Sequence, residues 1–289
     1  MTYFDFSESQ IAVLAQADCA RAIAEDVGEG DLTAALIEPS RRVKARILAR
    51  EAAVICGTPW VNAAVHQLDP HASIRYHVAE GSVCQTNQII LEIEGNAQAL
   101  LTAERTALNF LQLLSGVATK TATFVRAIAD IPNNRAKIVD TRKTIPGLRL
   151  AQKYAVRTGG GTNHRIGLFD AILIKENHIA AAGGVSTALQ RAQVAAKNAK
   201  FIEIEVETLE QLREALDHGA TMVLLDNMNL AQMQEAVTIN QGRAILEVSG
   251  GVNLATVRDI AATGVDRISI GGLTKDVQAI DFSMRFEDL

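Results

Sequence analysis

Four short apolar runs repeat at near-constant intervals in the second half of the chain. They lie at residues 201–206, 222–226, 244–248 and 267–271. Their last residues fall near Glu205, Asp226, Ser249 and Gly271, at intervals of 21, 23 and 22 residues. An interval of this length accommodates one strand and one helix, so each run is predicted to be the strand of a βα unit. Successive βα units of this kind are typical of an α/β barrel.

Two earlier apolar runs, at 137–141 and 171–175, bring the number of expected parallel strands to six. Six is fewer than the eight strands of a closed barrel. We expect this domain to span residues 116–275.

The first part of the chain has a different pattern and predicts a separate domain over residues 1–115, an open α/β sandwich with helices on one side of a sheet. Its expected helices are residues 9–26, 59–68 and 97–114, where apolar residues recur at helical spacing. Its expected strands are residues 43–50, 53–57, 73–78 and 88–93.

Positive charge is concentrated in residues 137–178, KIVDTRKTIPGLRLAQKYAVRTGGGTNHRIGLFDAILIKENH. The stretch holds eight Lys and Arg residues and three acids, a net charge of +5, whereas the whole chain carries −5. Nucleic-acid binders usually show a broad basic surface and a high pI. A cationic stretch in an acidic chain therefore indicates a pocket for a small anion and no nucleic-acid partner.

Donors suited to carboxylates follow the first two expected barrel strands, where a parallel barrel places its site. They are Arg142, Lys143, His164, Arg165 and Lys175. One or two such residues would most often form structural ion pairs. Five of them, with only Asp140, Asp170 and Glu176 nearby, leave positive charge that favours an anionic ligand.

The later strands end in a second kind of residue. Glu205 and Asp226 are acids at successive strand ends, and each alone would be interpreted as a cap or an ion-pair partner. Together they could hold ribose hydroxyls or a hydrated Mg²⁺, which accepts few carboxylates and substrate phosphate oxygens. The glycine-containing ends after the last two strands could be tight turns or could expose N–H groups to a phosphate. These residues are Ser249, Gly250, Gly251, Gly271 and Gly272.

Several motifs in order resemble the quinolinate phosphoribosyltransferase family, the carboxylating nicotinate-nucleotide pyrophosphorylases. They include EDVGEGDLT, ERTALNFLQLLSG, DTRKTIPGLR, GGGTNHR, ILIKENH, IEIEVE, LLDNM, EVSGG and SIGGLT, so the resemblance covers essentially the whole chain. It implies transfer of a phosphoribosyl group from 5-phosphoribosyl 1-pyrophosphate to quinolinate with decarboxylation. The expected products are nicotinate mononucleotide, pyrophosphate and CO₂, a step of de novo NAD biosynthesis.

The resemblance also implies that the α/β barrel of about six strands is incomplete and open, that it forms the catalytic domain, and that the C-terminal tail, 276–289, packs back on the first domain. It further assigns roles to residues. It implies a dicarboxylate site of Arg105, Arg142, Lys143, His164, Arg165 and Lys175. Lys143, Lys175, Glu205 and Asp226 are the expected catalytic residues, and the two acids are the expected Mg²⁺ ligands, either directly or through water. It further implies a homodimer with a shared active site in which Arg105 is contributed in trans. On pattern alone, Arg105 beside Glu104 would be a solvated or salt-bridged helix residue.

Three other functions remain open on the residues alone. A base phosphoribosyltransferase that does not decarboxylate would need fewer cations. A Schiff-base aldolase would need an apolar surrounding for Lys175. A phosphometabolite-binding barrel without catalysis would not need the full set of polar strand ends. The three cysteines form no CxxC pair, and the N-terminus, MTYFDFSESQ, has no signal-peptide pattern, so we expect a cytoplasmic protein without a membrane segment.

Overall fold

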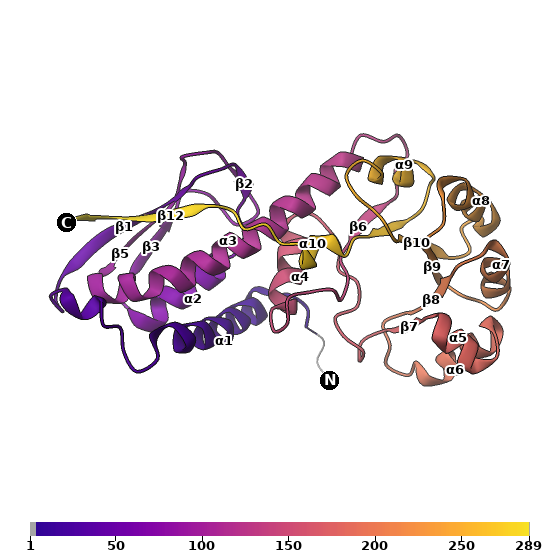
Figure 1. Cartoon of the computed structure of the whole chain (residues 1–289), viewed down its shortest axis with the longest axis horizontal. Coiled ribbons are helices and arrows are strands. Elements are labelled where there is room, and N and C mark those ends of the chain that lie inside the picture. Colours follow the sequence, from indigo (N-terminus) through magenta and orange to yellow (C-terminus); the bar gives the residue numbers. More distant parts are fainter. Residues whose placement is uncertain (1–3, 289) are drawn as a thin grey trace. The chain divides into compact units, whose positions relative to one another are not determined.

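The computed structural model describes residues 4–288, which form two compact units. The first unit contains residues 4–122, 145–160 and 276–288. The second contains residues 123–144 and 161–275. Figure 1 shows the elements of both units in chain colours. No helix among the described residues is long and apolar enough to cross a membrane.

The first unit is built on a four-stranded antiparallel sheet, in the order β12-β1-β5-β3. These strands are β1 (Arg42–Ala49), β3 (Ser73–Tyr76), β5 (Ile89–Asn96) and β12 (Phe282–Asp288). A two-stranded sheet pairs β2 (Ala53–Val54) with β4 (Val83–Cys84). The helices are α1 (Glu8–Val27), the 3₁₀ turn η1 (Ala34–Leu36), α2 (Thr58–Leu68), α3 (Ala97–Ile128) and α4 (Arg149–Thr158).

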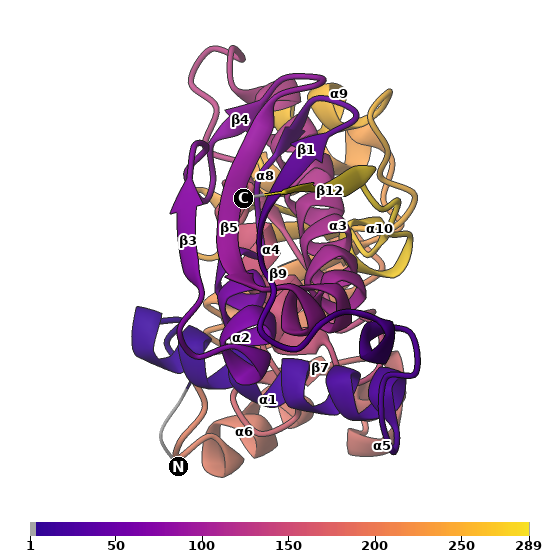
Figure 2. The same ribbon diagram turned by 90° about the vertical axis from the view of Figure 1, so that its left-hand side faces the viewer.

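The sheet of the first unit has one face toward the core and one charged face. Along β1, Val43, Ala45, Ile47 and Ala49 are buried, and the residues between them are more exposed. This alternation is the period-2 pattern of a strand with one covered face. Figure 2 shows this sheet together with α1, α2 and α3. The predicted α/β sandwich is confirmed.

Two predicted element boundaries were wrong for identifiable reasons. The strand predicted at 53–57 ends at Val54, because the Cys56 amide donates to Ser115 Oγ and leaves the ladder. The helix predicted at 97–114 continues to Ile128 as α3, through Gly116. A Cβ at Gly116 would lie 2.2 Å from the carbonyl oxygen of Gln278, so this glycine allows close packing and does not end the helix. The domain boundary expected at residue 115 falls inside this continuous helix.

The second unit is an open barrel of six parallel strands in the order β6-β11-β10-β9-β8-β7. The strands are β6 (Lys137–Val139), β7 (Ile172–Ile174), β8 (Ile202–Val206), β9 (Met222–Asp226), β10 (Ile245–Ser249) and β11 (Arg267–Ser269). The helices are α5 (Glu176–Ala182), α6 (Val185–Ala195), α7 (Leu209–Asp217), α8 (Leu230–Asn240), α9 (Val257–Ala262) and α10 (Gly272–Lys275). The predicted open barrel of about six parallel strands is confirmed.

The opening of the barrel lies beside β6, where a loop segment runs along the strand. Thr162 forms a parallel bridge with Val139, and its N–H donates to the carbonyl of Ile138 at 2.8 Å. The N–H of Asp140 then donates to the carbonyl of Thr162 at 3.1 Å. This pairing fixes the start of the loop at residues 161–171, which carries His164 and Arg165.

Candidate active site

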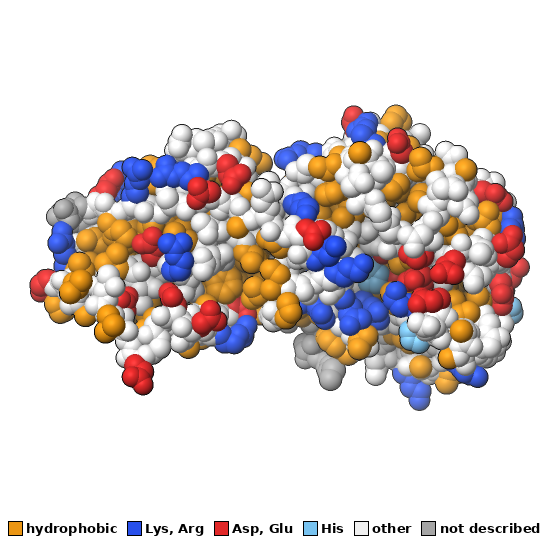
Figure 3. Space-filling model, in the orientation of Figure 1, with side chains coloured by type: hydrophobic (Ala, Val, Ile, Leu, Met, Phe, Trp, Pro, Cys, Tyr) orange, Lys and Arg blue, Asp and Glu red, His pale blue; other side chains and the backbone are white. Residues whose placement is uncertain are grey.

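The carboxyl ends of the second unit's strands bring most of the predicted site residues to one end of the barrel. Asp226 is the last residue of β9 and pairs in register with Ser249, the last residue of β10. Glu205 lies in β8, and Lys175 follows β7 directly. In the space-filling view, Lys and Arg side chains gather beside Asp and Glu side chains on the face that carries β7, β8 and β9 (Figure 3).

Lys175 and Glu205 form an ion pair between neighbouring strands. Lys175 Nζ donates to Glu205 Oε2 at 2.9 Å, and the Lys175 side chain is 47% exposed while that of Glu205 is 10% exposed. Lys175 also precedes α5, whose first turn it caps together with His178. The pair therefore joins Lys175, which is predicted to bind quinolinate, to Glu205, which is predicted to bind the ribose or Mg²⁺.

Lys143 reaches the end of the last strand from the loop after β6. A Cβ built on Gly271 would lie 3.0 Å from Lys143 Cδ and 3.8 Å from Nζ. Thr274 Oγ1 in α10 donates to the carbonyl of Lys143 at 2.7 Å. Gly271 therefore leaves room for the lysine stem, and the ammonium group lies near the end of β11.

Asp226 is oriented by the residue that follows it. Asn227 Nδ2 donates to Asp226 Oδ2 at 2.7 Å. Asn227 adopts a left-handed backbone with φ of 53°, which asparagine tolerates better than most residues. A Cβ at Gly250 would lie 2.3 Å from Asn227 Oδ1, and Gly250 itself has φ of 97°. The glycine after β10 thus leaves room for the side chain that orients the β9 carboxylate.

Two acids of the cationic stretch accept hydrogen bonds from the loop that carries His164 and Arg165. Asp140 is fully buried and accepts from Asn163 Nδ2 at 2.6 Å and from the His164 N–H at 2.8 Å. Asp170 accepts the N–H groups of Ile166 and Gly167, both at 2.9 Å. Two of the three acids in residues 137–178 are therefore committed to the shape of the loop.

Arg165 lies in this loop close to other cations. Its Nη1 donates to the carbonyl of Ala171 at 3.3 Å. Burial lowers the pKa of the Arg165 guanidinium, and the nearby charge of Arg142 lowers it further. A cation destabilised by burial and by like charge is stabilised when an anion binds beside it. This arrangement favours a carboxylate ligand.

His164 differs from the other members of the predicted cationic set because its ring is buried and engaged within the chain. Its Nδ1 accepts the N–H of Arg165 at 2.7 Å, and its Nε2 lies 2.8 Å from Glu203 Oε2. An Nδ1 that accepts carries no proton, so the ring is the neutral tautomer with its proton on Nε2. The ring also makes an edge contact with Phe201, with centroids 5.4 Å apart.

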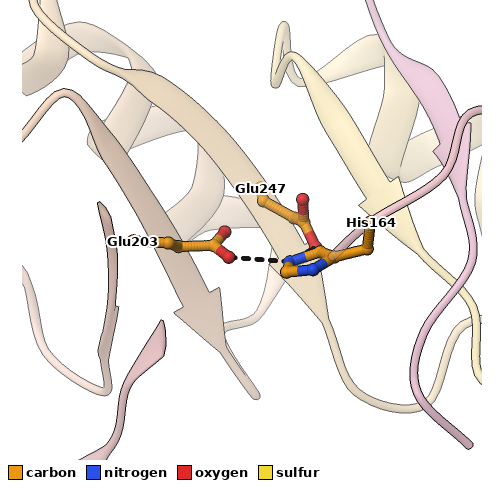
Figure 4. Close-up of side chains that lie close together, drawn as sticks. All are labelled: His164, Glu203 and Glu247. Carbon is orange, nitrogen blue, oxygen red and sulfur yellow. Dashed lines mark hydrogen bonds and ion pairs between the residues drawn. The ribbon is translucent and has the colours of Figure 1, made fainter. Parts of the chain in front are cut away.

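Sequence reasoning did not identify Glu203, Glu247 or Arg267 as members of the site. Both glutamates are fully buried and face His164 (Figure 4). Arg267 Nε donates to Glu247 Oε2 at 2.6 Å, between paired residues of β10 and β11. The usable signal was a glutamate inside each of two apolar strands, IEIEV and ILEVS, because a charge inside a covered sheet requires partners.

Arg105 is the one predicted site residue in the first unit. It lies in α3 and lines a cavity of about 180 Å³ with Glu25, Asp26 and Asn109, among others. Its exposed side chain forms no hydrogen bond or ion pair with the residues that the structure describes. Of the two alternatives expected from the pattern alone, the structure therefore shows the solvated helix residue and not the salt-bridged one.

The three consecutive glycines have a packing role at their first position. A Cβ at Gly159 would lie 2.3 Å from the carbonyl of Ala118 and 2.8 Å from Thr121 Cβ. Gly159 therefore allows the end of α4 to pack closely on α3.

The sequence matches two family descriptions in tandem. Residues 31–115 match "Quinolinate phosphoribosyl transferase, N-terminal domain", and residues 117–285 match "Quinolinate phosphoribosyl transferase, C-terminal domain". A probable nicotinate-nucleotide pyrophosphorylase (carboxylating) of Bacillus subtilis is 41% identical over 260 residues, covering 90% of this chain and 89% of the relative. A mitochondrial quinolinate phosphoribosyltransferase (decarboxylating) of Nicotiana tabacum is 39% identical over 286 residues, covering 92% and 80%.

Solved structures give the same result. The nicotinate-nucleotide pyrophosphorylase from Francisella tularensis superposes with a TM-score of 0.91 at 43% identity, covering 96% of this chain and 97% of its own. That from Ehrlichia chaffeensis superposes with a TM-score of 0.88 at 38% identity, covering 98% and 100%. With both domains matched in order over most of its length, the chain belongs to the quinolinate phosphoribosyltransferase family.

Proposed function

We propose that this protein transfers the phosphoribosyl group of 5-phosphoribosyl 1-pyrophosphate to quinolinate and releases nicotinate mononucleotide, pyrophosphate and CO₂. The observation that carries the proposal is the separation of charge at the barrel end. Cationic side chains follow β6 and β7, and acids and glycines end β8, β9, β10 and β11. An aromatic dicarboxylate and a phosphorylated sugar need these two surroundings side by side.

Arg142, Arg165 and Lys175 are proposed to hold the two carboxylates of quinolinate, with Lys143 nearby and Arg105 completing the set. An arginine fork binds a carboxylate through two parallel hydrogen bonds, which also fixes the plane of the pyridine ring. The like charge of Arg142 near Arg165 supports this role, because an anion bound beside the two guanidinium groups offsets their repulsion. Binding then orients the ring nitrogen toward the sugar.

Glu205 and Asp226 are proposed to hold the ribose side, and the N–H groups at Ser249–Gly251 and Gly271–Gly272 the phosphate. The two carboxylates lie on adjacent parallel strands and offer hard oxygen donors, which fits Mg²⁺ with water and phosphate oxygens as its other ligands. Mg²⁺, when bound, would neutralise charge on the leaving pyrophosphate. The Lys175–Glu205 pair places an ammonium group next to the same region.

In the proposed reaction, the protein positions the two substrates and stabilises the charges that develop on them. As pyrophosphate leaves C1, positive charge develops on the sugar, and the carboxylates of Glu205 and Asp226 stabilise it. The ring nitrogen of quinolinate attacks C1 and becomes a cationic pyridinium. The bond from C2 to its carboxylate then breaks, and the electron pair stays at C2 beside the positive nitrogen until a proton arrives. No covalent intermediate with the protein is needed.

We propose a homodimer in which Arg105 serves the partner's barrel. Support comes from the first unit, where the guanidinium of Arg105 is exposed and without an ion-pair partner among the described residues. A two-fold symmetric contact would make such a contribution reciprocal. The three cysteines are free and buried, which fits a protein of the reducing cytoplasm.

The Schiff-base alternative loses support because Lys175 is half exposed and paired with a carboxylate, whereas a nucleophilic lysine needs a surrounding that lowers its pKa. Turnover with quinolinate labelled at the 2-carboxylate tests the proposal. We expect labelled CO₂ and nicotinate mononucleotide in equal amounts, and only when phosphoribosyl pyrophosphate is present. Turnover of nicotinate without CO₂ release would instead assign a non-decarboxylating transferase.

A further inference from the structure

The interior of the barrel contains a buried polar cluster formed by His164, Glu203, Glu247 and Arg267. Ligand atoms of the histidine and both glutamates lie within 4.8 Å of one another (Figure 4). His164 Nε2 is 2.8 Å from Glu203 Oε2 and 3.5 Å from Glu247 Oε1. One oxygen of each glutamate and Arg267 Nη2 have no hydrogen-bond partner among residues 4–288.

This cluster has one negative charge more than its arginine balances. Two carboxylates face one guanidinium, and the histidine is neutral because its Nδ1 accepts the Arg165 N–H. Burial raises the pKa of both carboxyl groups. The arginine beside Glu247 opposes entry of a metal cation.

The imidazole of His164 connects the cluster to the backbone of the loop at residues 161–171. Glu203 fixes Nε2, the ring plane is fixed by Phe201, and Nδ1 then holds the backbone N–H of Arg165. The imidazole is therefore a rigid spacer between the barrel interior and the backbone of a residue that we assign to the substrate. Hydrogen bonds from residues behind a binding site commonly fix the orientation of the side chains that contact the ligand.

We propose that Glu203 is a positioning residue for the dicarboxylate site: it holds His164 in the neutral Nε2–H tautomer, and His164 in turn sets the position of Arg165. This inference rests on the proposed role of Arg165. It assigns His164 to orientation of the arginine rather than to direct charge pairing with the substrate. The charged or titratable groups around Glu203 are His164, Glu247, Arg267, Arg165, Glu205 and Lys175.

The test compares Glu203→Leu, which removes the acceptor, with Glu203→Gln, whose amide oxygen still accepts from Nε2. We expect Glu203→Leu to raise the KM for quinolinate roughly tenfold, as loss of one hydrogen bond to a charged group does, with the KM for phosphoribosyl pyrophosphate unchanged. Glu203→Gln should restore the quinolinate KM.

Glu235→Gln is the matched control, because it makes the same chemical change in the second unit at an exposed ion pair with Arg213 on neighbouring helices. Nitrogen NMR of His164 should report a proton on Nε2 and none on Nδ1. Equal loss of affinity for both substrates in Glu203→Leu, a doubly protonated His164, or a stoichiometric metal at the cluster would each overturn the inference. If Arg165→Ala leaves quinolinate affinity unchanged, the proposed site has failed instead.

Discussion

Replacement of Gly250 by alanine separates backbone strain from damage to the site. Gly250 has φ of 97°, and the added Cβ would lie 2.3 Å from Asn227 Oδ1. An L-residue in the left-handed region costs about 1–2 kcal/mol. Displacing Asn227 also removes its 2.7 Å hydrogen bond to Asp226, and loss of a hydrogen bond in an exposed position costs about 1 kcal/mol more.

Gly219→Ala is the control, because Gly219 has φ of 79° and its Cβ would meet no atom within 4 Å. It lies between α7 and β9, at the strand end opposite the proposed site. Denaturant unfolding should show a loss of about 1–2 kcal/mol in Gly219→Ala, with activity retained. Gly250→Ala should lose more stability and about tenfold in kcat/KM for phosphoribosyl pyrophosphate, with quinolinate affinity intact. Equal behaviour of the two variants in both assays would refute the reasoning.

Arg165→Ala should weaken quinolinate binding by roughly 1.5–3 kcal/mol and leave phosphoribosyl pyrophosphate binding nearly unchanged in calorimetry; equal losses would contradict the assignment. Asp226→Asn should lower turnover at saturating quinolinate and alter its Mg²⁺ dependence, and a wild-type dependence would count against the metal role. Inactive Arg105→Ala and Lys175→Ala subunits should recover roughly a quarter of wild-type activity after random exchange, whereas exchanged but inactive mixtures would reject a shared site. Burial raises the pKa of Glu203 to about 7. Between the ordinary pKa of a glutamate and about 7, the folded state therefore binds a proton that the unfolded state has lost. As the pH rises through that window, the wild type should lose at most about 3 kcal/mol of stability relative to Glu203→Gln. Parallel curves of unfolding free energy against pH for the two proteins would refute this.

The strands of the barrel were predictable because their apolar runs repeat at one βα unit each. The same pattern placed Glu205, Asp226 and Ser249 at strand ends, where the structure has them. The interior cluster was not predictable, because Glu203, Glu247 and Arg267 are separated by 20 or more residues and meet only across β8, β10 and β11. The alternation of apolar and acidic residues in β8 does not show which of its acids faces a histidine.

Glycines were the least predictable residues for a physical reason. Gly159 and Gly116 are required because a carbonyl distant in sequence lies against each of them, and Gly271 lies against the side chain of Lys143. A local pattern of glycines indicates a turn or a loop near a ligand equally well. Only the three-dimensional structure shows that Gly159 and Gly116 allow close helix packing and that Gly271 makes room for Lys143.

A crystal structure of the complex with quinolinate tests the central claim most directly, because it shows which side chains hold the two carboxylates. The account predicts that both carboxylates lie on the cations after β6 and β7, with Arg142, Arg165 and Lys175 in contact and the ring nitrogen turned toward Glu205 and Asp226. Quinolinate bound instead at the glycine-rich ends of β10 and β11, with Arg142 and Arg165 not in contact with it, would contradict the account.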